Sequence, residues 1–152
     1  MRTVVPIAAL LVLSLNAGSL RASSADNAEP TQQSIDALEA RASQAQPREQ
    51  CFLYAQLVQQ MTELSIRQYT AGDVTRATGL LKQIQRIAQK IHLSLADNDK
   101  RLKNAELLLS RTAFRLNEML QSSSMEDRPL VEQTLARVTD AKNEAMMQVF
   151  RK

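Results

Sequence analysis

The fold of this chain is decided by one long segment, residues 74–120, which reads VTRATGLLKQIQRIAQKIHLSLADNDKRLKNAELLLSRTAFRLNEML. Its apolar side chains recur in alternating steps of three and four residues. The stripe has fourteen positions, of which only Asn98 and Thr112 are polar: Val74, Ala77, Leu81, Ile84, Ala88, Ile91, Leu95, Asn98, Leu102, Ala105, Leu109, Thr112, Leu116 and Met119. This spacing places the whole stripe on one helix face and predicts coiled-coil-like packing between helices.

The same segment leaves one structural choice open. The stripe keeps its phase through residues 96–99, where no Gly or Pro forces a stop, so Asp73–Leu120 could form a single helix. At 1.5 Å per residue such a helix would be about 72 Å long. Asp and Asn are, however, poor residues for a helix interior and good capping residues. We therefore favour a break at this point, which gives helices of equal length.

A second helix is predicted just before this segment. Pro47 suits the first turn of a helix, because its missing N–H would have no partner there. The apolar residues that follow cluster on one side, and Gly72 and Asp73 provide a stop and a new N-terminal cap. Helices joined this tightly fold back on each other, so we expect an antiparallel hairpin over Arg48–Leu95.

A last helix is expected after Asp127-Arg128-Pro129, again with Pro in its first turn. Its stripe consists of Val131, Leu135, Val138, Ala141, Ala145 and Val149. The chain of 152 residues has only 3 Gly, 4 Pro and no Trp, which argues against a β-sandwich or a β-barrel. The predicted fold class is all-α: an antiparallel bundle of about four helices, made of the hairpin and two further helices.

The N-terminal segment has the features of an export signal. Arg2 precedes an apolar run over Val4–Leu15, which is shorter than the roughly 20 residues of a membrane-spanning helix. Small residues at Ser23 and Ala25 suit cleavage by a signal peptidase. We expect residues 1–25 to be a cleaved secretory signal, with an uncleaved anchor as the alternative. The mature protein would then be periplasmic or secreted and would contain no transmembrane segment.

The remaining chain divides into two parts. Residues 26–47 are expected to form a flexible leader, because residues 26–34 are polar and contain Pro30. A short helix could form within this leader, capped by Thr31, with a thin apolar stripe that ends before Pro47. Residues 48–152 form the predicted helical bundle domain.

Charge is unevenly distributed along the chain. Removal of Arg2 and Arg21 leaves 17 of the 19 basic residues against 16 acidic ones, so the mature chain is close to neutral and nucleic-acid binding is not expected. Lys82, Arg86 and Lys90 recur every four residues and form a candidate basic interaction ridge. This ridge could meet an anionic envelope component or an acidic protein. Alternatively, the preceding acidic segments of the same chain neutralise it.

Candidate chemical groups are few. A metal or haem site needs several convergent ligands, and His92 is the single histidine of the chain. We therefore predict no catalytic residues, no metal and no cofactor, and we expect the methionines to fill the core. Cys51 is the single cysteine, so it is either buried or forms a disulfide with a second chain. A homo-oligomer is a further expectation.

Several segments resemble known proteins. The turn Ala71–Ala77 resembles the inter-helix turn of a tetratricopeptide hairpin, although no second copy follows it. Cys51–Ala55, Lys100–Leu108 and Met146–Phe150 resemble a group of short, signal-bearing bacterial α-helical proteins of unassigned function. The resemblance implies export and a helical fold, and it implies no activity.

Together these features predict a non-catalytic exported protein that mediates protein–protein or envelope interactions. A periplasmic chaperone or adaptor, and a bundle that binds a small ligand, are the alternative functions.

Overall fold

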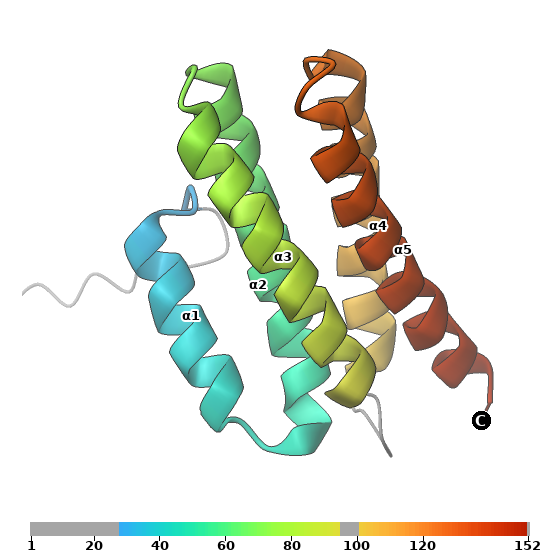
Figure 1. The fold of residues 1–152 in the computed structure, drawn as a ribbon. Helices are drawn as coiled ribbons and strands as arrows, with labels where there is room; N and C mark the ends of the chain where they lie inside the picture. The colour runs from blue at the N-terminus through green and yellow to red at the C-terminus, as the bar shows by residue number, and fades with distance from the viewer. Residues whose placement is uncertain (1–27, 95–100, 152) are drawn as a thin grey trace, which may run out of the picture.

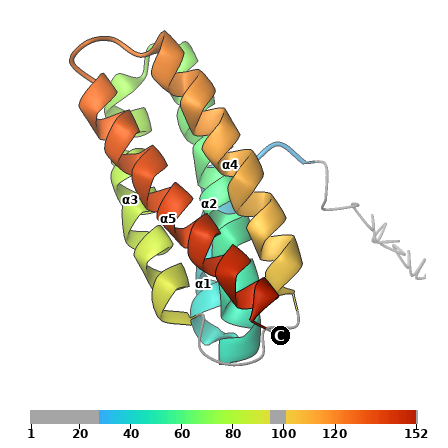
Figure 2. The same cartoon turned by 90° about the vertical axis from the view of Figure 1, so that its right-hand side faces the viewer.

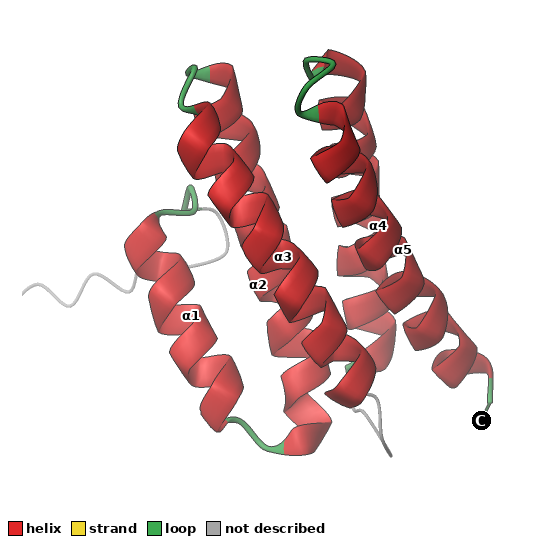
Figure 3. Cartoon of the chain, viewed as in Figure 1, coloured by secondary structure: helices red, strands yellow, loops and turns green. Residues whose placement is uncertain are grey.

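The computed structural model describes residues 28–94 and 101–151, and these residues contain helices and no strand. The all-α fold class is therefore confirmed (Figures 1 and 3). The described helices number five, which are the four of the predicted bundle and the short helix that the sequence allowed within residues 26–47. They are α1 (Gln32–Gln44), α2 (Pro47–Thr70), α3 (Val74–Ser94), α4 (Leu102–Ser122) and α5 (Arg128–Phe150).

The turn between α2 and α3 forms as its sequence predicts. Pro47 opens α2, and Gly72 adopts a positive φ of 86° just after α2 ends. The Asp73 carboxylate accepts a hydrogen bond of 3.2 Å from the backbone N–H of Arg76, so it caps α3. These local signals produce the helical hairpin, because each one satisfies backbone groups that the helix end leaves without a partner.

The helix α1 is the additional element. Thr31 caps it through a capping box, and Ile35 and Ala42 are fully buried where α1 packs against α2. Arg67 of α2 also forms an ion pair with Glu29, just before α1. A flexible leader with an optional helix was expected over residues 26–47, but residues 32–44 form a helix that is docked on the rest of the fold.

The helices α2 to α5 are arranged as two hairpins that lie side by side. Within each hairpin the helices are antiparallel, α2 with α3 and α4 with α5 (Figure 1). Across the hairpins α2 contacts α4 and α3 contacts α5, and these neighbours run in the same direction (Figure 2). The predicted antiparallel packing therefore occurs within each hairpin, whereas the contacts between the hairpins are parallel (Figure 2). The helix α1 packs on α2, on the side of the molecule away from α4 and α5.

The predicted stripe lines the core in both α3 and α4. Buried stripe residues are Ala77, Leu81, Ile84, Ala88, Ile91, Leu102, Ala105, Leu109, Thr112, Leu116 and Met119. Val74 is the exception, with 38% of its surface exposed at the start of α3. Leu95, Asn98 and the favoured break at residues 96–99 lie outside the described residues. The helices on either side of them run in opposite directions, which excludes one straight helix over Asp73–Leu120 (Figure 1).

Two threonines inside the core satisfy their own hydroxyl groups. Thr112 and Thr134 each donate a hydrogen bond of 2.8 Å to the carbonyl four residues earlier in the same helix. Gln85 of α3 also donates a 3.0 Å bond to the Thr134 hydroxyl, which links α3 to α5. Because a buried hydroxyl costs free energy only when it lacks a partner, these polar residues are compatible with the apolar stripe.

Candidate interaction surfaces

The basic ridge predicted from the sequence lies on the outer side of α3. Lys82, Arg86 and Lys90 are all exposed. Arg86 and Lys90 line a groove of about 360 Å³, and Asp36 and Glu39 of α1 line the same groove. The ridge therefore faces carboxylates of the same chain over part of its length, which weakens its field toward a partner.

The individual cations of the ridge differ in their surroundings. The Lys90 ammonium lies over the ring of Tyr54 on α2, 5.7 Å from the ring centroid, which is within the range of a cation–π contact. Lys82 does not line the groove shared with α1. Among the residues that the structure describes, neither Lys82 nor Arg86 forms an ion pair.

The outer face of α4 is a second candidate surface, and it was not singled out from the sequence. Leu107 is 49% exposed and Phe114 is 62% exposed, although both are large apolar residues. Lys103 and Arg111 are exposed at positions that alternate with them along the helix. Residues spaced by three, four and seven lie on one side of a helix. Lys103, Leu107, Arg111 and Phe114 therefore form one stripe, called here the α4 outer face.

The charges on this face are not neutralised within the described part of the chain. Neither Lys103 nor Arg111 takes part in an ion pair there. The helix α4 contacts α2 and α5 through its other sides, and α1 does not reach it. An exposed aromatic residue flanked by unpaired cations is a recurring feature of interaction surfaces.

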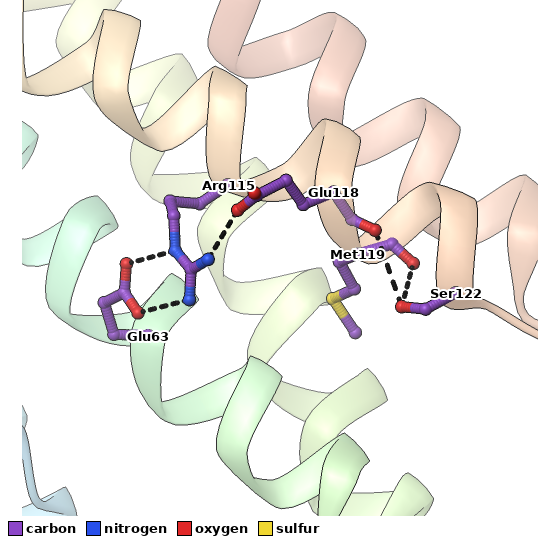
Figure 4. A network of polar contacts seen from close by, with 5 residues as sticks. All are labelled: Glu63, Arg115, Glu118, Met119 and Ser122. Atoms are coloured by element: carbon purple, nitrogen blue, oxygen red, sulfur yellow. Dashed lines mark hydrogen bonds and ion pairs between the residues drawn. The ribbon is translucent and has the colours of Figure 1, made fainter.

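Arg115 lies one turn after Arg111 and, by contrast, forms ion pairs with two carboxylates (Figure 4). Its guanidinium donates bonds of 3.0 and 3.1 Å to the two carboxylate oxygens of Glu63 on α2, and a further bond to Glu118. The bonds to Glu63, and then those to Glu118, raise the pKa of Arg115 above its usual range. The bidentate contact between Arg115 and Glu63 connects α4 to α2 and orients α4 with its outer face toward solvent.

The turn between α4 and α5 is fixed by a phenol from α2. The Tyr69 hydroxyl donates a 3.0 Å bond to Asp127 and accepts a 2.9 Å bond from the backbone N–H of Ser124. The Ser124 hydroxyl completes the network with a 2.7 Å bond to Asp127. One end of α4 is thereby held in place, as a binding surface on a rigid element requires.

The methionines are divided between the core and the surface. Met61 and Met119 are buried as expected, whereas Met125, Met146 and Met147 are exposed, so the prediction of core filling is wrong for these three. Phe150 is also 79% exposed and follows the methionine pair at the C-terminal end of α5. The prediction failed because periodicity identifies the inner stripe but not the apolar residues that no other helix covers.

The remaining candidate residues can be located only in part. Cys51 is fully buried in α2, so a disulfide with a second chain would require α2 to open locally. The side chain of His92 lies outside the described residues, as does the predicted signal segment. Within the described residues, no group of three or more His, Cys, Asp or Glu side chains is arranged to hold a metal ion.

Comparisons with known proteins found no match. No family model matches the chain, and neither a curated protein nor a solved structure matches it. None of the described helices is long and apolar enough to cross a membrane.

Proposed function

We propose that this chain is an exported, non-catalytic binding protein that docks on another macromolecule of the cell envelope through the α4 outer face. The observation that carries the proposal is the exposure of Leu107 and Phe114 beside Lys103 and Arg111, two cations that form no ion pair with any residue the structure describes. Export through a signal cleaved after Ala25, and a periplasmic or secreted location, are part of the same proposal.

The energetics favour association at this face. Leu107 and Phe114 are 49% and 62% exposed, so covering the part of each side chain that water now contacts contributes about 1–2 kcal/mol per residue. Lys103 and Arg111 would add electrostatic attraction to an acidic partner and would select against basic ones. The four helices α2 to α5 act in this proposal as a rigid bundle that presents α4, with its register fixed by the Arg115–Glu63 contact.

The proposal can be tested by photocrosslinking from the face itself. A photoreactive amino acid at position 114 should give a discrete adduct when the mature protein is mixed with envelope extract. The same group at position 125 is the control, because Met125 is 84% exposed but lies outside the face. Arg111→Glu should abolish the adduct formed from position 114. Equal adducts from both positions, or none from 114, would contradict the proposal.

The exposed end of α5 favours a second candidate function. Met146, Met147 and Phe150 offer flexible apolar side chains, which suit the binding of many unfolded clients rather than one partner. A chaperone or adaptor role predicts that the mature protein suppresses aggregation of an unfolding client. The double substitution Met147→Ser and Phe150→Ser should remove this effect, whereas Arg111→Glu should leave it unchanged.

A further inference from the structure

The groove between α1 and α3 has an unusual distribution of charge. Its α1 wall carries Asp36 and Glu39, and its α3 wall carries Arg86 and Lys90. Met61 and Ile87 form an apolar floor, and the amides of Gln32 and Gln83 complete the lining. The groove has a volume of about 360 Å³, which lies within the usual range for small-molecule sites.

The carboxylates of α1 and the cations of α3 lie on opposite walls of the groove but do not contact each other. No ion pair joins the two walls in the described part of the chain. The Asp36 carboxylate instead accepts a 2.8 Å bond from the Gln32 side chain, and Lys90 lies over the Tyr54 ring. The helix α1 packs on α2 and not on α3, so the space between the walls stays open.

We propose that this groove binds a small zwitterion, such as an amino acid or a short peptide with both ends free. The ligand carboxylate would contact Arg86 and Lys90, and its ammonium group would contact Asp36 and Glu39. Charge-assisted hydrogen bonds at both ends give such a ligand an advantage over one that carries a single charge. The apolar floor would accept a small side chain.

This site is independent of the proposed docking function. The groove and the α4 outer face share no residue, and α4 contacts neither α1 nor α3, the two helices that form the groove walls. Failure of one proposal therefore leaves the other unaffected.

The experiment is a titration of the labelled mature protein, followed by amide chemical shifts in NMR spectra. The probes are dialanine, N-acetyl-dialanine, which lacks the ammonium group, and dialanine amide, which lacks the carboxylate. We expect dialanine to shift amides of α1 and α3 saturably, with a Kd on the order of 1 mM. Each singly charged probe should bind about tenfold more weakly, because it loses one charge-assisted contact.

Three variants assign the contacts. Asp36→Asn and Arg86→Gln should each weaken dialanine binding about tenfold. Lys82→Gln is the matched control, because Lys82 belongs to the same ridge but does not line the groove, and it should leave binding unchanged. Equal responses to all three probes, or equal affinities of Arg86→Gln and Lys82→Gln, would overturn the proposal. The proposal would also fail if the parent protein bound no dialanine and Asp36→Asn and Arg86→Gln both lowered the melting temperature. In that case the charges of Asp36 and Arg86 would serve only to hold α1 in place.

Discussion

The helices α3 and α4 have the same length, 21 residues, and the same buried heptad stripe, yet their outer sides differ. Outside α3, the cations Arg86 and Lys90 share a groove with the carboxylates of α1. Outside α4, Lys103 and Arg111 lie beside exposed Leu107 and Phe114, and none of the other described helices covers them. The apolar stripe on the inner side of each helix therefore accounts for its packing into the core. What the outer side of a helix can bind depends instead on the helices that lie next to it.

The same contrast recurs within α4 between two arginines one turn apart. Arg115 is bound by Glu63 and Glu118, while Arg111 makes no ion pair with a described residue. Sequence alone gives both residues the same chemistry. Their different roles follow from α2, which brings a carboxylate to one of them and not to the other.

The largest expected effect separates the inner side of α4 from its outer side. Leu116 is fully buried, so Leu116→Ala should lower the free energy of unfolding by about 2–5 kcal/mol through lost burial and a cavity. Leu107→Ala, on the outer face, should change it by less than about 1 kcal/mol. Chemical denaturation followed by circular dichroism measures both. Similar losses in the two variants would show that another surface covers Leu107.

A smaller effect is expected from the contact that orients α4. Glu63→Gln removes the ion pair with Arg115 but keeps a similar shape, and it should cost up to about 1 kcal/mol because the pair is partly exposed. The loss should shrink in high salt, as screening weakens the pair. Thermal melts in low and high salt provide the measurement. Glu132→Gln, an exposed change on α5, is the control and should show no salt-dependent loss.

The pH dependence of this contact follows from the direction of the Arg115 shift. Because the folded state raises the pKa of Arg115, its contribution to stability is fully present below the pKa of the unfolded state. The contribution is lost only when the pH rises through the folded-state value, in strongly alkaline solution. The stability difference between the parent and Glu63→Gln should therefore not fall between neutral and mildly alkaline pH.

The helical part of the fold was largely predictable because its signals are local. The caps at Thr31 and Asp73, the first-turn prolines and Gly72 each act on backbone groups within a few residues. The docking of α1 was not predictable, since its stripe is thin and only Ile35 and Ala42 are buried among the helical residues. Local signals report which residues form a helix, but not which distant helix covers them.

The surfaces were less predictable for the same reason. The basic ridge was found from its four-residue spacing, but its acidic neighbours on α1 depend on tertiary packing. The sequence signal for the α4 outer face is that Leu107 and Phe114 are large apolar residues outside the main stripe. They are exposed because α4 packs on α2 and α5 through its other sides. The periodicity of the sequence does not predict which helices become neighbours.

Two double charge reversals that change the net charge equally test most directly whether the α4 outer face is the docking surface. Lys103→Glu with Arg111→Glu alters the α4 outer face, and Lys82→Glu with Arg86→Glu alters the α3 ridge. Cosedimentation of each mature variant with envelope fraction measures the association. We predict that the α4 pair abolishes it, while the α3 pair retains most of the parent binding. Equal losses in both pairs would show that net charge alone drives binding, and retention by the α4 pair would contradict the proposed docking face.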